Sequence, residues 1–134
     1  MTEARLTDQE IQERAERFEE LLDEALRLGG GTHTRQNVVD QIQANQAKVW
    51  FSLDNEGVVI SERRQYPSGL ILANGWLGAG KFESILTMKD ELEDYARASG
   101  AHGVTMTVAK AHRAWLKHLP DFRLMGYHLR KDFE

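Results

Sequence analysis

The sequence predicts a single α/β domain over residues 1–134, in which one mixed β-sheet carries helices on both faces. The first observation behind this prediction is a nearly continuous apolar run over residues 70–77, which is typical of a central strand covered on both faces. The second is that an amphipathic helical pattern and another apolar run, residues 104–108, follow it in the order of a parallel β-α-β unit. The third is an earlier pair of β-rich runs around Asp54-Asn55-Glu56-Gly57, which indicates an antiparallel hairpin.

Residues 1–30 are predicted to form an acidic amphipathic helix. Thr7 and Glu10 have the spacing of a capping box, in which each side chain satisfies a free backbone donor at the start of the helix. Apolar residues then recur every three or four positions and make one stripe, consisting of Ile11, Ala15, Phe18, Leu22 and Ala25. The three glycines at residues 29–31 end this pattern.

Residues 31–134 are predicted to hold a second helix, the sheet and two further helices. The second helix begins at Thr34, and its predicted buried residues are Val38, Val39 and Ile42. Strands are expected over residues 49–53, 58–66, 70–77, 104–108 and 122–133. The further helices are expected over residues 82–99, burying Ile85, Met88 or Lys89, Leu92, Tyr95 and Ala96, and over residues 110–119, ended by Pro120. In the last strand, alternation places Met125, Tyr127 and Leu129 on one face.

Composition excludes several classes of protein. The chain has no cysteine, which excludes disulfides, thiolate zinc sites and thiol catalysis. No apolar run reaches membrane-spanning length, and the N-terminus lacks a secretory pattern, so we expect no membrane association and no secretion by a signal peptide. No pair of histidines has the spacing of metal ligands, and we therefore predict no metal site.

Charge is distributed unevenly along the chain. The formal net charge is -4, and residues 1–28 carry nine acids against four arginines. From residue 109 onward, six basic residues stand against three acids. This asymmetry predicts an anion or an acidic partner near the C-terminal part, and it favours protein partners or self-association. Nucleic acid ranks last as a partner, because the chain is acidic overall and no aromatic residue lies on the helix face that Lys110, Arg113 and Lys117 share.

A glycine-rich stretch joins the predicted central strand to the long helix. Gly75 and Gly80-Lys81 fit most of a nucleotide-binding loop, but Phe82 stands where a serine or threonine hydroxyl would hold Mg²⁺. The order of elements instead resembles the GCN5-related N-acetyltransferase (GNAT) fold without its usual first strand. In that family a loop with the pattern Q/R-x-x-G-x-G/A holds the pyrophosphate of coenzyme A on its amides. Gly75-Trp76-Leu77-Gly78-Ala79-Gly80 corresponds to it, with Gly75 in place of the leading glutamine or arginine.

The resemblance implies that coenzyme A or acetyl-CoA binds here. The amides and charge that would hold it belong to Leu77, Gly78, Ala79, Gly80 and Lys81. The alternative is that the glycines only make a tight connection in which the backbone needs a positive φ. The two interpretations remain open at this point.

Residues for catalysis are harder to assign. The family usually protonates the leaving thiolate with a tyrosine on the short helix, and Trp115 is the only aromatic residue in the corresponding stretch here. Glu62 is a candidate base and His118 a candidate acid or base, although the commoner role of each residue type at such a position is a solvated or structural one. Whether the protein is an enzyme therefore stays undecided at this point.

The second half of the chain is similar to small GNAT-like proteins of tailed bacteriophages, some of which are internal virion proteins. The residues that carry this likeness are Tyr95-Ala96-x-x-x-Gly100, Trp115-x-x-x-Leu119 and Leu129-Arg130-Lys131. It implies a catalytically degenerate protein that acts through protein contacts, with other virion proteins among its partners, in the host cytoplasm or in a phage particle. The alternative is an active acetyl-CoA-dependent N-acetyltransferase acting on an amine.

Overall fold

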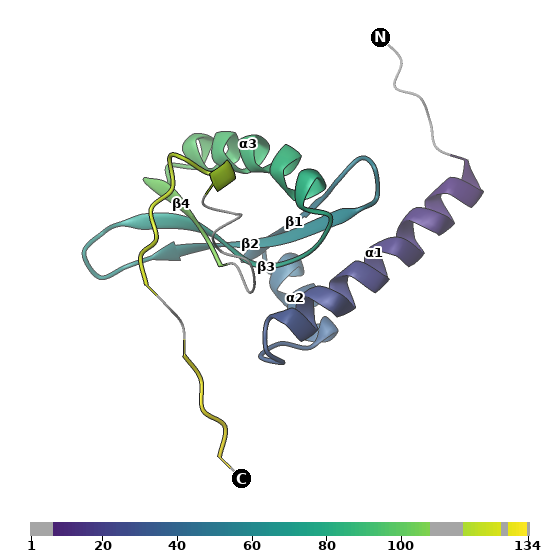
Figure 1. Cartoon of the computed structure of the whole chain (residues 1–134), viewed down its shortest axis with the longest axis horizontal. Helices are drawn as coiled ribbons and strands as arrows, with labels where there is room; N and C mark the ends of the chain where they lie inside the picture. The colour runs from purple at the N-terminus through teal and green to yellow at the C-terminus, as the bar shows by residue number, and fades with distance from the viewer. Residues whose placement is uncertain (1–6, 108–116, 127–128, 134) are drawn as a thin grey trace.

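The computed structural model describes residues 7–107, 117–126 and 129–133 (Figure 1). Its elements are α1 (Asp8–Leu28), α2 (Arg35–Gln43), β1 (Ala47–Phe51), β2 (Gly57–Gln65), β3 (Ile71–Gly80), α3 (Phe82–Ala98) and β4 (Gly103–Met106). The strands form one sheet in the order β1-β2-β3-β4. β1, β2 and β3 are antiparallel neighbours, whereas β3 and β4 are parallel. The predicted fold class, a mixed sheet entered through a hairpin and a β-α-β unit, is confirmed.

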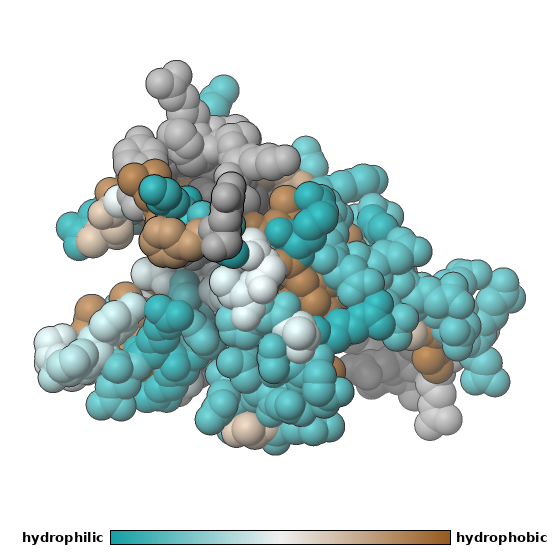
Figure 2. Space-filling model, turned by 90° about the horizontal axis from the view of Figure 1, so that it is seen from below, coloured by the Kyte–Doolittle hydropathy of each residue, from teal (hydrophilic) through white to brown (hydrophobic). Residues whose placement is uncertain are grey.

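Helices cover both faces of the sheet, as predicted. α3 lies on one face, while α1 and α2 lie on the other (Figure 1). Val58, Ile60 and Leu77 pack against α1 and α2 in the larger core cluster. On the opposite face, Val59 packs with Ile85 and Met88 of α3. The side of the molecule that holds α1 and α2 is mostly hydrophilic, with apolar atoms visible in its middle (Figure 2).

The first helix starts as the sequence predicts but is buried over only part of its length. Both hydrogen bonds of the Thr7–Glu10 capping box are present. In the second half, Leu21, Leu22 and Ala25 are buried. The prediction of one buried stripe from Ile11 to Ala25 is wrong at its start, because Ile11 is 53% exposed and Ala15 is also exposed. The reason is geometric: the first turns of α1 extend beyond the sheet (Figure 1).

Two other expectations of burial, for Val39 and Tyr95, and the expected end of the first strand at Leu53 are wrong. Val39 is 38% exposed, because α2 contacts the core through Val38. Leu53 is 94% exposed, because β1 ends at Phe51 and Leu53 lies in the turn. Tyr95 is 43% exposed on the edge of α3, where its ring contacts that of Trp50.

The C-terminal part differs most from the sequence prediction. The expected strand over residues 104–108 is β4, which ends at Met106, and residue 108 lies outside the described residues. The expected helix over residues 110–119 is described only at Lys117 and beyond, with Leu119 buried just before Pro120. The expected final strand is wrong for the residues that the structure describes: 122–126 and 129–133 have no strand structure. Tyr127 lies outside the described residues.

We predict that the two halves of α1 contribute unequally to stability. Leu21→Ala removes a fully buried side chain and is expected to lower the free energy of unfolding by about 2–5 kcal/mol. Ile11→Ala on the same helix is expected to change it by less than about 0.5 kcal/mol, because that side chain is largely exposed. Urea denaturation of the two variants measures the difference. Equal losses would contradict the position of α1 described above.

Candidate functional site

The segment predicted to bind coenzyme A is the end of a strand and not a loop. Residues 77–80 pair with β2, with Leu77 opposite Ile60 and Gly80 opposite Gly57. A β-bulge interrupts this register, so that Ile60 is paired with Leu77 and Ser61 with Gly75. The intervening residue, Trp76, packs against the core on the α1 side. The expectation of a loop at this position is therefore wrong.

Within residues 7–107, 117–126 and 129–133, no strand pairs with the edge of residues 77–80 that faces away from β2. β4 pairs with β3 only as far as Gly75, opposite Met106. The Gly57 carbonyl accepts a hydrogen bond from the Ser52 amide at 2.9 Å, on the β1 side, so Gly57 and Gly80 are not a hydrogen-bonded pair. Pairs alternate along an antiparallel ladder, and Gly78 therefore directs its N–H and C=O away from β2, towards the side on which β4 has ended.

Position 80 requires a glycine, because a side chain here would collide with the backbone of Glu56. Its φ is +114°, and an added Cβ would lie 2.0 Å from the Glu56 carbonyl oxygen. The next residue, Lys81, donates its amide to the same oxygen at 2.8 Å. A Cβ at Gly78 would meet its nearest neighbour at 3.4 Å, which is an ordinary contact. Of the two interpretations of the glycines, the tight backbone connection accounts for Gly80 without any ligand.

The start of α3 lies next to this strand end. Lys81 is the N-cap residue, and its side chain makes no capping hydrogen bond. The Lys81 side chain is 67% exposed, and its Nζ lies 3.9 Å from Glu56 Oε2. Glu83 adds a carboxylate in the first helical turn. A helix N-terminus attracts anions, and here the chain itself supplies carboxylates around it.

Among these carboxylates, Asp54 has a clearly lowered pKa, which its hydrogen bonds explain. Its oxygens accept hydrogen bonds from the hydroxyls of Ser52 and Ser84, both at 2.6 Å, and from the Glu56 amide at 3.0 Å. These hydrogen bonds lower the pKa of Asp54 to about 2, and the Ser52 hydroxyl has the largest effect, followed by the Ser84 hydroxyl and the Glu56 amide. The positive charge of Lys81 lowers this pKa further. Because Ser84 belongs to the first turn of α3, this hydrogen bond fixes a negative charge beside the start of the helix.

Glu62 lies elsewhere on the sheet. It is opposite Asn74, well along β2 from the pair formed by Gly57 and Gly80. Its carboxylate accepts from Arg64 Nε at 2.6 Å and from Asn74 Nδ2 at 3.4 Å, while Asn74 Oδ1 accepts from the Thr105 hydroxyl at 2.8 Å. The carboxylate therefore belongs to a hydrogen-bonded row across β2, β3 and β4, paired with a guanidinium.

His118, in contrast, lies near the start of α3. Its ring contacts that of Phe82 with a centroid separation of 5.0 Å. The structure thus places His118 against the first residue of α3 and leaves Glu62 at another part of the sheet. His112, Trp115 and His128 lie outside the described residues, as do Lys110 and Arg113.

The described tyrosines do not lie at this junction. Tyr95 contacts Trp50, and Lys48 Nζ lies 3.8 Å from the centroid of the Tyr95 ring. The Tyr66 amide donates to the Leu70 carbonyl in the turn between β2 and β3. Neither is placed to protonate a leaving group beside Lys81.

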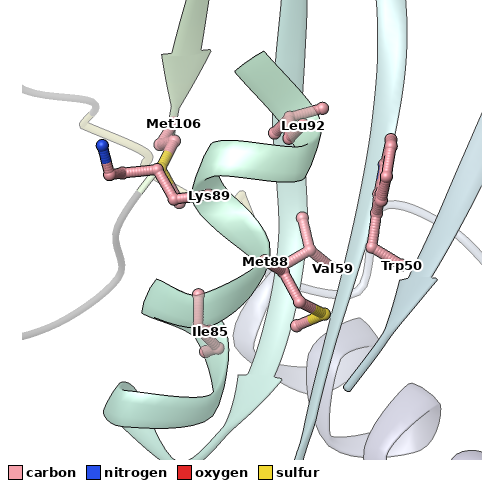
Figure 3. A pocket seen from close by; sticks show the side chains of 7 residues that line it. All are labelled: Trp50, Val59, Ile85, Met88, Lys89, Leu92 and Met106. Carbon is pink, nitrogen blue, oxygen red and sulfur yellow. The ribbon is translucent and has the colours of Figure 1, made fainter. Parts of the chain in front are cut away.

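An apolar hollow lies between α3 and the sheet (Figure 3). Its lining consists of Trp50, Val59, Ile85, Met88, Lys89, Leu92 and Met106. Lys89 is the polar exception, and Nζ of this residue pairs with Asp90 and Glu93, each at 3.3 Å. The hollow is a gap in the packing of the core residues around Met88 and offers no set of polar groups for a ligand.

Within residues 7–107, 117–126 and 129–133, no group of three or more side chains is arranged to hold a metal ion. The helices in the same ranges include none with the length and apolarity needed to span a bilayer. The residues that sequence reasoning missed are Asp54 and Glu56, which were assigned only to a turn. Their acidity beside a glycine-rich strand end was visible in the sequence, but their position at the start of α3 depends on the pairing of β2 with β3.

We predict that Asp54 makes stability depend on acid pH. Its pKa is lowered in the folded chain from an ordinary 3.8 to about 2, so its contribution is fully present above about pH 4 and is lost as the pH falls towards 2. Asp54→Asn removes this contribution, and the stability difference from the native chain should shrink over that window. Ser84→Ala keeps the charge of Asp54 but removes one hydrogen-bond donor, so its stability should lie between those of the native chain and Asp54→Asn. Thermal midpoints measured from pH 7 to pH 2 check this, and a pH-independent difference would contradict it.

Comparisons with protein-family models and with curated proteins find no match for this chain. A comparison with solved structures finds a crystal structure of an acetyltransferase of Trypanosoma brucei. The TM-score is 0.54 and the sequence identity 14%, over 73% of this chain and 77% of the other. At this identity the match concerns the fold alone. The chain has a mixed α/β architecture consistent with the GNAT-like fold that its order of elements resembles.

Proposed function

We propose that this chain is a GNAT-like protein that does not transfer acetyl groups and acts through protein contacts, in a bacteriophage particle or another assembly. The observation that carries the proposal is the charge at the β3–α3 junction. The place that the resemblance assigns to a pyrophosphate is bordered by Asp54, Glu56 and Glu83.

The balance of these charges disfavours a second anion. Arg17 Nη2 pairs with Glu56 Oε2 at 3.2 Å and neutralises that carboxylate. Among the described residues, Lys81 is the cation beside Asp54, and its charge lowers the pKa of Asp54. A pyrophosphate at this place would be repelled by the carboxylates of Asp54 and Glu83, and this repulsion opposes the attraction of the helix dipole.

The placement of the candidate catalytic residues supports the same proposal. Glu62 is committed to Arg64 and Asn74, and it does not share a site with His118. Neither Tyr66 nor Tyr95 reaches the start of α3. Acetyl transfer requires a base and an acid within reach of the same reacting atoms, and the described residues do not supply that pair.

Protein contact is supported by exposed apolar side chains. Large apolar residues that are more than half exposed include Ile11 on α1, Leu53 in the β1–β2 turn, and Met125, Leu129 and Phe133 near the C-terminus. The C-terminal group has three of these residues within nine positions and is flanked by Arg123, Arg130 and Lys131. Exposed apolar patches that are bordered by polar residues are typical of surfaces that bind other proteins.

A thermal-shift titration with acetyl-CoA tests the proposal. We expect no rise in the melting temperature of the native chain, because only a ligand that binds the folded state raises it. Asp54→Asn combined with Glu56→Gln removes two carboxylates from the junction, and this variant should gain a shift that the native chain lacks. A shift with the native chain, together with release of free thiol in the presence of an amine, would overturn the proposal.

The matched control neutralises two carboxylates of α3 that lie beyond its first turn. Asp90→Asn combined with Asp94→Asn changes the net charge by the same amount, and both side chains are highly exposed. This variant should gain no shift with acetyl-CoA. Gly80→Val is unsuitable as a test of binding, because its side chain would collide with the Glu56 carbonyl whether or not a ligand binds there.

The second candidate is an active acetyl-CoA-dependent N-acetyltransferase. Two observations favour it: a solved structure that matches this fold is that of an acetyltransferase, and the Gly78 amide lies on a strand edge with which no described strand pairs. In this alternative the amides between Leu77 and Lys81 hold the pyrophosphate, and His118, whose ring contacts that of Phe82, is the candidate acid or base. The acetyl-CoA experiment above decides between the candidates.

The assembly part of the proposal has its own test. If the chain belongs to a bacteriophage particle, mass spectrometry of purified particles should detect it at a constant ratio to the major structural proteins. Particles treated with protease before analysis should retain it if it lies inside. Absence from purified particles would contradict the phage assignment.

A further inference from the structure

A histidine side chain closes the start of the pairing between β3 and β4. In the turn that joins α3 to β4, the His102 amide donates to the Ile71 carbonyl at 2.7 Å. The Ile71 amide in turn donates to His102 Nδ1 at 3.0 Å. The imidazole therefore takes the place of a backbone carbonyl, and it adds one step to the parallel ladder that begins with Leu72 opposite Gly103.

This hydrogen bond requires one protonation state of His102. A backbone amide can only donate, so Nδ1 must accept, and the ring proton of the neutral imidazole then lies on Nε2. A proton on Nδ1 would remove the acceptor and place two donors against each other. Histidine ordinarily changes its charge between about pH 5 and pH 8. Because His102 is exposed, protons reach it directly from solvent.

His33 has a similar contact with the opposite property. Its Nδ1 lies 2.8 Å from Thr32 Oγ1. A hydroxyl both donates and accepts, so this hydrogen bond persists with the roles reversed when the ring gains a proton. The partner of Nδ1, and not the presence of a histidine, is therefore what makes the contact of His102 sensitive to pH.

The charges on the elements around His102 also oppose its protonation. Arg63 of β2 donates from Nη1 to the Ser99 carbonyl at 2.7 Å, in the same turn between α3 and β4. β3 and β4 have no charged side chain. The other charged or titratable side chains at this end of β2 and α3 are Glu62, Arg64, Tyr66, Asp94 and Arg97. The charged ones form two ion pairs, at 2.6 Å on β2 and 3.7 Å on α3, so the surplus charge is that of Arg63 and is positive.

We propose that His102 is a pH-dependent switch, and that its protonation opens the start of β4. The proposal goes beyond the proposed function and does not depend on it. β4 has only four residues, so the bond at its start affects a large part of the strand. Its other end is held separately, by the Thr107 amide on the Gly75 carbonyl at 3.1 Å and by the Thr105 hydroxyl on Asn74. Opening is therefore confined to the turn and the first residues of β4.

The direction of the pH dependence follows from the proton balance. The folded chain holds His102 neutral, whereas the unfolded chain leaves it free to take up a proton. The unfolded state thus binds more protons as the pH falls, and the stability that this hydrogen bond supplies is lost in the same direction. It is present at about pH 8 and is lost towards about pH 5.

The experiment measures the protection factor of the Ile71 amide by hydrogen exchange from about pH 8 to about pH 5. This factor corrects the exchange rate for the pH dependence of a free amide. In the native chain it should fall by at least about threefold, because one hydrogen bond is lost. Amides of β1, at the opposite edge of the sheet, should keep their protection. Protection of Ile71 that does not change over this range, or that falls only together with β1, would overturn the proposal.

Two asparagine substitutions make the test specific. In His102→Asn the side-chain Oδ1 takes the position of Nδ1 and gains no proton in this range, so the protection of Ile71 should become independent of pH. His33→Asn, the matched control, should keep the pH dependence of the native chain. The same fall of protection in His102→Asn, or its loss in His33→Asn, would overturn the proposal.

The tautomer of His102 gives a check that needs no variant. Nitrogen-15 chemical shifts of the native chain at about pH 8 should show the ring proton on Nε2 and a bare Nδ1. A proton on Nδ1 at this pH would overturn the proposal, whether or not the variants fold. None of these measurements uses acetyl-CoA, so their outcome is independent of the test of the proposed function.

Discussion

The turn between β1 and β2 holds three parts of the molecule together. The Ser52 hydroxyl accepts hydrogen bonds from the Gly57 and Glu56 amides, which closes the turn. α1 is attached to it through Arg14, which donates to Asn55, and through Arg17, which pairs with Glu56. The start of α3 is attached through Ser84 and Asp54, and the end of β3 through the Lys81 amide. The turn therefore supports the packing of α1 on the sheet and helps to fix the junction of β3 with α3.

The same turn limits the chemistry available at the junction. A carboxylate that accepts three hydrogen bonds remains charged at neutral pH, and Asp54 therefore places a permanent negative charge beside the first turn of α3. The backbone contributes to the same constraint, because the Glu56 carbonyl occupies the space that a side chain on Gly80 would need. Gly80 and the Asp54 carboxylate thus both stabilise the connection between β3 and α3. What resembles an anion-binding loop in the sequence is explained, at Gly80, by contact with a neighbouring strand.

Sequence reasoning succeeded where local rules decide the structure. The capping box at Thr7, the order of the strands and the parallel pairing of β3 with β4 follow from spacing and periodicity that tertiary contacts did not override. It failed where the result depends on what lies next to a residue. A glycine pair looks the same whether a phosphate or a carbonyl oxygen approaches it, and the sequence does not distinguish these for Gly80. Ile11 and Leu22 lie on the same helical stripe, but only Leu22 has the sheet beside it. For the candidate site, the position of His118 near Phe82 and the commitment of Glu62 to Arg64 both required the structure.

The C-terminal residues 122–126 and 129–133 show a further limit of the same kind. Alternation of apolar residues indicates that a segment can form a strand with one buried face, but it does not indicate whether a neighbouring strand is within reach. These described residues have no strand structure, and the Arg130 guanidinium donates to the Gly30 carbonyl in the turn after α1. The pattern therefore identifies side chains that could share a face, whereas the contacts that these residues make depend on parts of the fold far away in the sequence.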